Sequence, residues 1–388
     1  MRAFLLVLHG IGVGAQADAS DYGDAGACTL LHVAEAAGCL RLPQLERLGL
    51  ARVREWPGAR AGVVVTGAYG RLATRSPGRD SLVSHRELAG LVTARALPVY
   101  VDALPAPALD RIAERIGRGW LGNPGPSLVE SILRHDAEHR RSGRIIVHAP
   151  GASALYFAAH CDVVGPADLL EMCREARTGL KGADAVGRVI SVSYDGGTRH
   201  DLRFADRHQL ALEPEAPTLL DRIAERGRPV LTVGYVDELF AGRGVTDALR
   251  TRTTDDALEA LADVVRVVRE GLIFAGLAVG EQEDESVADA AGLAHALERV
   301  DARLGPILDR LRSDDLLLIT ADHGQDPGVG PGSPTRELVP LLATGPRVRA
   351  NVDLGIRASL ADAGATLAEY FGAARLEAGK SFLREIRA

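Results

Sequence analysis

The sequence predicts an α/β protein with a mainly parallel sheet and an inserted α+β domain. Apolar runs rich in β-branched residues and bounded by glycine alternate with amphipathic helical stretches, a pattern typical of strands connected by helices. The chain has 388 residues, 46% hydrophobic and 25% charged, which exceeds the roughly 100–200 residues of one ordinary domain. The pattern changes between Pro98 and Pro214. We therefore expect a core of residues 1–98 and 214–388 and a cap of residues 99–213.

The strands expected in the core follow its apolar runs: Ala3–Leu8, Pro229–Val233, Leu272–Ala278 and Leu316–Thr320. Several of them end in polar or small residues where a loop begins. In open parallel sheets, ligands bind at these carboxyl ends. The polar residues at or just past such ends are His9, Glu281, Asp322 and His323. These residues, far apart in the sequence, are expected to converge.

The expected cap contains both helices and strands. Its helices are predicted at Leu109–Ile116, Leu128–Arg140 and Pro166–Thr178, and its strands at Arg144–His148 and Val186–Val192. A stretch rich in glycine, aspartate and arginine follows at Asp195–Asp206, after which helix and strand alternation resumes. This arrangement favours an α+β insertion.

Charge, hydropathy and cysteine content exclude several classes of protein. The net charge of −7 offers no basic surface for nucleic acid. No apolar run approaches the roughly 20 residues that cross a bilayer, and Ala3–Leu8 is too short for a signal peptide. The four cysteines form no CxxC pair, which favours a reducing cytoplasm. We expect a cytoplasmic protein with a small-molecule substrate and neither nucleic-acid nor membrane partners.

The strongest local signal is the segment Leu316–Gly324. A hydrophobic strand there delivers the adjacent pair Asp322 and His323 into a glycine turn. A carboxylate and an imidazole presented at one point commonly hold a divalent metal. The alternative is an aspartate that caps the next turn beside a solvated histidine.

These motifs and others resemble the phosphopentomutases, a family of the alkaline phosphatase superfamily of metalloenzymes. The matching stretches run through nearly the whole chain and include Gly12–Ala15, Tyr22–Gly26, Leu42–Leu50, Gly78–Ser81, Val186–Ile190, Asp301–Leu304, Thr320–Pro327 and Thr335–Glu337. The resemblance implies an alkaline-phosphatase-like core with an inserted cap. It also implies two manganese ions and a phosphorylated threonine that relays phosphate between two positions of a pentose.

Ser81 occupies the position of the family's nucleophilic threonine. Its hydroxyl can attack phosphorus when a metal lowers its pKa, although a serine following Asp80 in a turn is an equal alternative. In the adjacent metal site, His9 replaces an aspartate, whereas Asp322 and His323 are retained. Two histidines, one carboxylate and a serine oxygen suit a tetrahedral site that favours zinc over manganese.

The second metal site of the family is largely absent from the sequence. Glu281 matches its aspartate, while Ser286 and Pro334 stand where its two histidines are found. Proline has no side-chain ligand, and a two-metal clamp needs both ions. The sequence therefore predicts at most one tightly held divalent metal, zinc or manganese.

The substrate-binding positions have changed as well. Ala152 replaces an aspartate, Val192 an arginine and Tyr235 a lysine, whereas Arg207 is retained. His148 ends a cap strand and is a further candidate for substrate binding, although a lone histidine there is more often a satisfied structural residue. Loss of two cations removes charge-assisted hydrogen bonds to phosphate, so ordinary ribose 5-phosphate recognition is not expected.

Three functional hypotheses follow. The first is metal-dependent phosphoryl transfer or hydrolysis through Ser81, on a phosphorylated sugar or a nucleoside-derived substrate. The second is a catalytically degenerate homologue that acts as a binding or regulatory protein. The third is a repurposed enzyme without a phosphoenzyme, in which His9 serves as an acid or base.

Overall fold

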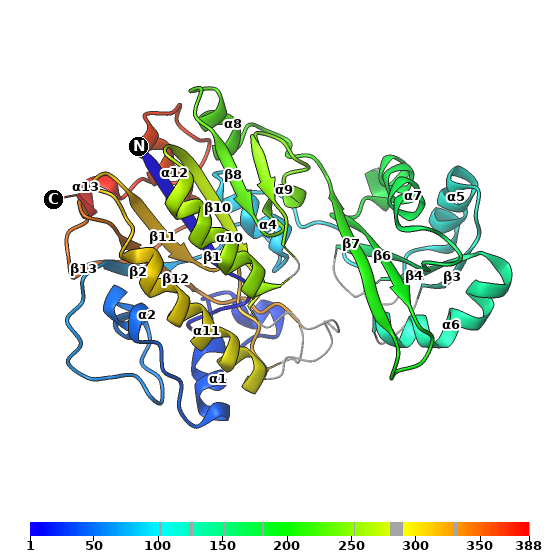
Figure 1. The fold of residues 1–388 in the computed structure, drawn as a ribbon, viewed down its shortest axis with the longest axis horizontal. Helices are drawn as coiled ribbons and strands as arrows, with labels where there is room; N and C mark the ends of the chain where they lie inside the picture. Colours follow the sequence, from blue (N-terminus) through cyan, green and yellow to red (C-terminus); the bar gives the residue numbers. More distant parts are fainter. Residues whose placement is uncertain are drawn as a thin grey trace. The chain divides into compact units, whose positions relative to one another are not determined.

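The computed structural model divides the chain into two compact units (Figure 1). It describes residues 1–100, 103–123, 127–149, 153–180, 182–251, 253–279, 290–329 and 333–387. The first unit, called the core, comprises Met1–Arg95 and the described residues from Pro214 onward. The second, called the cap, comprises the described residues of Ala96–Glu213.

The core is built on an eight-stranded sheet with the order β13-β2-β12-β11-β1-β10-β8-β9. Its strands are β1 (Arg2–Leu8), β2 (Ala68–Leu72), β8 (Val230–Val233), β9 (Asp247–Leu249), β10 (Gly271–Leu277), β11 (Leu316–Thr320), β12 (Val339–Thr344) and β13 (Val352–Arg357). Only the two pairings of β12, with β11 and with β2, are antiparallel. The predicted α/β class with a mainly parallel sheet is therefore confirmed.

Helices cover both faces of the central strands, since every residue of β1 and β10 is buried. One group that packs together is α1 (Thr29–Ala37), α2 (Pro43–Leu48), α10 (Thr254–Val267) and α11 (Ala290–Leu308). A second group is α4 (Ser81–Leu88), α8 (Leu219–Ala224), α9 (Val236–Leu239) and α12 (Ala361–Phe371). The core also holds the short helices η1 (Ala19–Tyr22), α3 (Leu50–Val53) and α13 (Leu383–Ile386). In the described part of the chain, no helix is long and apolar enough to cross a membrane.

The cap has the α+β composition predicted for it. Its mixed sheet follows chain order and consists of β3 (Trp120–Asn123), β4 (Ile145–His148), β5 (Ala154–His160), β6 (Arg188–Asp195) and β7 (Arg203–Ala211). Its helices are α5 (Ala106–Ile116), α6 (Leu128–Ser142), α7 (Pro166–Gly179) and the short η2 (Gly182–Asp184). Apolar clusters lie between the sheet and α5 and α7, and between the sheet and α6. Strand β7 begins within the polar stretch Asp195–Asp206, and β5 was not among the expected strands.

Candidate active site

Two neighbouring strands of the core bring His9, Asp322 and His323 together. Strands β1 and β11 are parallel, with Val7 opposite Thr320, so the two segments that follow leave the sheet side by side. Side chains alternate between the two faces of a strand, and His9 and Asp322 each lie two residues beyond this pair. As a result, the imidazole of His9 and the carboxylate of Asp322 meet at the carboxyl edge, where Nδ1 of His9 lies 2.9 Å from Oδ2 of Asp322.

The potential metal-ligand atoms of these three residues all lie within 4.8 Å of one another. Nε2 of His323 lies 3.4 Å from Oδ2 of Asp322. The hydroxyl of Ser81 adds a fourth donor, 3.0 Å from Nε2 of His323 and 3.5 Å from Nδ1 of His9. One imidazole from each of two strand ends, a carboxylate and a serine oxygen are thus gathered around one point. This donor set fits a divalent metal ion.

Ser81 owes its position to the start of α4. Asp80 caps this helix, and its side chain accepts a hydrogen bond from the backbone N–H of Leu82 at 2.8 Å. Ser81 is therefore the first helical residue, where the helix dipole favours negative charge. A phosphoryl group that approaches the hydroxyl would meet this positive end of the helix.

The hydrogen bonds around the cluster leave its ligand atoms pointing inward. Nδ1 of His323 donates to the carbonyl of Gly324 at 2.8 Å, so its Nε2 keeps a lone pair toward Ser81. Oδ1 of Asp322 accepts backbone N–H groups from Gly10 and His323, which leaves Oδ2 for the cluster. Outer hydrogen bonds of this kind orient metal ligands.

Electrostatics favours the protonation states that bind metals. Burial would raise the pKa of Asp322, but the charges of His323 and His9 hold that pKa well below its usual range. Burial also lowers the pKa of His323, against the attraction of Asp322. An ionised carboxylate and a neutral imidazole are the forms that coordinate a cation.

The positions predicted for a second metal are incompletely described. Glu281 lies outside the described residues, as does Ser286. Pro334 is half-buried and precedes Thr335, and its side chain has no atom that could bind a metal. Within the described ranges, His9, Asp322 and His323 form the one cluster of histidine, cysteine and acidic side chains able to hold an ion.

The predicted substrate-binding residues lie in both units. In the core, Tyr235 follows β8, and its ring meets that of His9 edge-on with centroids 6.2 Å apart. In the cap, His148 and Arg207 both contact Tyr156. The ring centroids of His148 and Tyr156 are 6.0 Å apart, and Nη2 of Arg207 lies 3.4 Å from the Tyr156 hydroxyl. Ala152 lies outside the described residues.

Two further residues that the predicted site did not include support this region. Glu87 is fully buried and accepts backbone N–H groups from Arg75, Ser76 and Leu360. His85 is also fully buried and contacts the cluster directly: its Nδ1 bonds to the carbonyl of Ser81 at 2.8 Å. The signal that identifies His85 is its spacing of four residues from Ser81, which places both on one face of a helix.

The Thr335–Glu337 motif joins loops around the site without reaching Ser81. Oε1 of Glu337 accepts the hydroxyls of Thr29 and Thr335, each at 2.7 Å, and Oε2 accepts the backbone N–H of Thr29 at 3.0 Å. A Cβ at Gly12 would lie 2.1 Å from Oε2 of Glu337, so only glycine fits there. Hydrogen bonding and close packing account for these motif residues.

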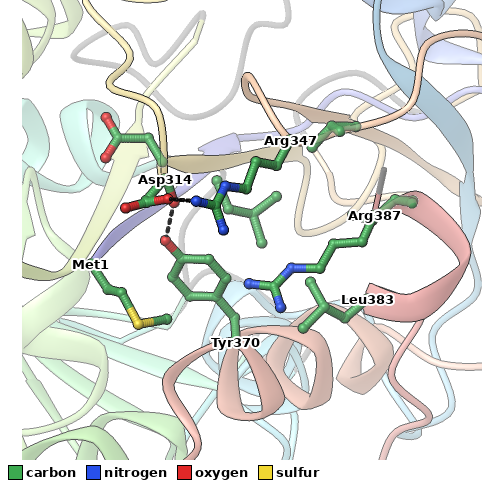
Figure 2. A pocket seen from close by; sticks show the side chains of 10 residues that line it. Met1, Asp314, Arg347, Tyr370, Leu383 and Arg387 are labelled. Carbon is green, nitrogen blue, oxygen red and sulfur yellow. Dashed lines mark hydrogen bonds and ion pairs between the residues drawn. The ribbon is translucent and has the colours of Figure 1, made fainter.

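A pocket of about 190 Å³ lies elsewhere on the core (Figure 2). It is lined by Met1, Asp314, Tyr370 and Arg347, among others, at the amino ends of β1 and β11. The hydroxyl of Tyr370 and the guanidinium of Arg347 both bond to Asp314, as Figure 2 shows. The pocket is thus at the sheet edge opposite His9 and Asp322, and it contains none of the predicted site residues.

Full-length relatives identify the family. The chain is 40% identical over 385 residues to the phosphopentomutase of Desulfitobacterium hafniense, which covers 99% of both chains. It is 39% identical to that of Caldanaerobacter subterraneus, over 99% of this chain and 98% of the relative. The chain belongs to the phosphopentomutase family.

Two other comparisons accompany this assignment. The family model of the Metalloenzyme superfamily matches residues 282–375, which implies the use of a divalent metal. The solved phosphoglycerate mutase of Leishmania mexicana aligns over 98% of this chain and 96% of its own, with 13% identity and a TM-score of 0.47. Membership of the phosphopentomutase family places the chain among the phosphomutases and phosphotransferases.

Proposed function

We propose that this protein catalyses metal-dependent phosphoryl transfer or hydrolysis through Ser81. The observation that carries the proposal is the convergence on its hydroxyl, with Nε2 of His323 at 3.0 Å and Nδ1 of His9 at 3.5 Å. A nucleophile, two imidazoles and the Asp322 carboxylate at a helix N-terminus form a site suited to phosphate chemistry.

In the proposed reaction, Oγ of Ser81 attacks the phosphorus of the substrate. A new O–P bond forms, the bond to the leaving sugar oxygen breaks, and that oxygen takes the proton that the Ser81 hydroxyl gives up. Water or another hydroxyl of the substrate then receives the phosphoryl group as the Oγ–P bond breaks, and the proton of this acceptor returns to Oγ of Ser81. When bound, a divalent metal supplies a Lewis acid that lowers the pKa of the serine hydroxyl and draws charge from the phosphoryl oxygens.

One zinc or manganese ion would be held by His9, Asp322 and His323, with the Ser81 oxygen as the fourth ligand. The choice of His9 over a carboxylate favours zinc, because imidazole suits zinc and carboxylates suit manganese. Glu281 would be a weak ligand of a second ion, a general base or an ion-pair partner.

The proposed substrate is a phosphorylated sugar or a nucleoside derivative. The relatives are named phosphopentomutases, which supports a sugar phosphate. In the core, Tyr235 beside His9 would contact the substrate. His148 and Arg207 are the candidates on the cap sheet. A phenol in place of a lysine favours a ligand with less charge or with an apolar group at that position.

The test combines elemental analysis with intact mass spectrometry. Purified protein is incubated with zinc or manganese and with a sugar phosphate or p-nitrophenyl phosphate. We expect one metal per chain and one added phosphoryl group that peptide mapping assigns to Ser81. Ser81→Ala removes the phosphoryl group, whereas Ser84→Ala, a buried serine on the same helix, keeps it. Absence of stoichiometric metal together with unchanged activity of Ser81→Ala would sink the proposal.

A second candidate is a binding or regulatory protein that keeps the fold without catalysis. Pro334 favours it, because a proline cannot replace a histidine ligand. The structural hydrogen bonds of Glu337 also favour it, since the motif would persist for the sake of the fold. This candidate predicts that neither phosphate donor ever labels Ser81, and a phosphoserine detected there rules it out.

A further inference from the structure

His85 lies where the helix that carries Ser81 meets the strand end that carries Asp322. Its Nδ1 is 2.8 Å from the carbonyl oxygen of Ser81 and 3.7 Å from Oδ2 of Asp322. A carbonyl oxygen only accepts hydrogen bonds, so Nδ1 must carry the proton. A single N–H group therefore faces two negatively polarised oxygens that belong to different elements, α4 and the segment after β11.

The other side of the imidazole does not explain why a histidine is found here. The ring stacks on Phe274 of β10, with centroids 5.9 Å apart and an interplanar angle of 18°. Nε2 is buried and has no hydrogen-bond partner among the described residues. A phenylalanine would stack equally well and would bury no such nitrogen. Packing alone would thus favour phenylalanine, and the Nδ1–H group is the part of His85 that the site uses.

We infer that His85 is a positioning residue that holds the carboxylate of Asp322 against the first turn of α4 through its Nδ1–H group. Without this group, no N–H dipole would lie between the Ser81 carbonyl oxygen and Oδ2 of Asp322, which Nδ1 faces at 2.8 and 3.7 Å. Oδ1 of Asp322 would keep its bonds to the backbone N–H groups of Gly10 and His323, but Oδ2 would shift relative to the imidazoles of His9 and His323, and metal affinity would fall. The inference rests on the proposed function, since it concerns the same metal site.

Three variants separate the Nδ1–H group from the ring. His85→Asn places an amide N–H close to the Nδ1 position and loses the ring. His85→Phe keeps the ring and loses the N–H group, and His85→Gln places its amide near the Nε2 position instead. We expect His85→Phe and His85→Gln to lower zinc affinity by about 10–100-fold, as loss of an outer partner of a metal ligand does. His85→Asn should restore most of that affinity.

Thermal stability distinguishes this positioning role from a purely structural one. His85→Phe should be at least as stable as the wild type, because stacking on Phe274 is kept and an unpartnered nitrogen is removed. His85→Asn should be less stable, because the stacking is lost. Affinity and stability would therefore rank the two variants in opposite orders. If His85 only filled space, both properties would rank them alike.

The experiment measures zinc affinity by competition with a chromophoric chelator and stability by calorimetry of the metal-free protein. His139 is the matched control: it is buried in the cap, and its Nδ1 lies 2.5 Å from the carbonyl of Arg144. His139→Phe should change stability and leave zinc affinity unchanged. A wild-type zinc affinity retained by His85→Phe would overturn the inference about His85. If the wild-type protein itself binds no zinc, the proposed metal site is wrong. That outcome is seen without any variant, so it is distinguishable from failure of the inference about His85.

Discussion

Arg336 and Asp18, 318 residues apart in the sequence, form a bidentate ion pair. Nε and Nη2 of Arg336 both reach Oδ2 of Asp18, at 3.2 and 2.9 Å. The same guanidinium donates to the carbonyls of Thr74, Ser76 and Gly78, in the segment that leads to Ser81. One buried side chain thus fixes the path of the chain into the candidate nucleophile.

Arg336→Lys is predicted to destabilise the core. A lysine has one ammonium group and cannot reproduce the planar fork that serves Asp18 and three carbonyls. Asp18 is 39% exposed, but the three carbonyl oxygens that the buried guanidinium serves would lose donors, at a cost of about 1–3 kcal/mol for each one left unpaired. Urea unfolding measures the loss, and Arg384→Lys, whose side chain is 93% exposed, is the control. Equal free energies of unfolding for the two variants would contradict the role given to Arg336.

Burial explains the presence of several family motifs in this chain. Asp24 bonds to Arg79 and to the backbone of Arg336, and Asp326 bonds to the backbone of Cys28 and to the imidazole of His32. Each of these acids is buried. Their loss would leave unpaired donors in the interior, which is destabilising whatever the reaction is. Persistence of these motifs is therefore a requirement of the fold and carries no information about turnover.

The sequence predicted those parts of the fold that local pattern determines. The strand Leu316–Thr320 was expected with the bounds that the structure has, because a short apolar run between polar residues indicates a buried strand. Strand β2 was missed, since its five residues include Gly70 and Arg71 and show no clear periodicity. Gly70 is required by the approach of the Gly355 carbonyl from β13, a contact between distant segments. Such pairings depend on tertiary structure.

The same distinction applies to the site. Strand ends suggested that His9, Asp322 and His323 converge, and the structure brings these residues together. What the sequence could not supply was the adjacency of β1 and β11, on which the contact depends. His85 follows Ser81 closely enough in the sequence to suggest that it shapes the site, but its contact with Asp322, which lies on another element, could not be predicted.

His9→Asp is predicted to change the preferred metal of the site. Replacing imidazole by a carboxylate should lower the affinity for zinc and raise that for manganese, because nitrogen ligands favour zinc. His9→Ala should weaken both metals by more than the 10–100-fold typical for loss of an outer-shell partner. Competition titrations with each metal measure the change. If His9 instead transfers protons near neutral pH, His9→Asp would abolish turnover while leaving metal affinity unchanged.

Asp301 is predicted to make stability depend on pH. It accepts backbone N–H groups of Gln44 and Leu45 at the start of α2, and burial raises its pKa from 3.8 to about 6. Between these values the native state keeps a proton that the unfolded chain has lost, so stability falls as pH rises from about 4 to about 6. The fall is on the order of 2–3 kcal/mol.

Asp301→Asn is neutral throughout this range and should remove that part of the pH dependence. Urea unfolding at a series of pH values provides the measurement. The control is Asp263→Asn on α10, an exposed position whose replacement should leave the wild-type profile unchanged. An Asp301→Asn profile that still declines between about pH 4 and 6 would assign the effect to other groups.

Arg207→Ala is predicted to weaken substrate binding without affecting the metal. The guanidinium of Arg207 lies over the ring of Tyr156, with its Cζ 5.9 Å from the centroid. If it also binds the substrate's phosphate, its removal should raise KM by about tenfold or more, because a hydrogen bond to a charged group contributes about 1.5–3 kcal/mol. Steady-state kinetics and zinc titration measure the two effects. Arg203→Ala, on the same strand with its guanidinium bonded to backbone carbonyls, is the control. An unchanged KM in Arg207→Ala would contradict the role in substrate binding given to this residue.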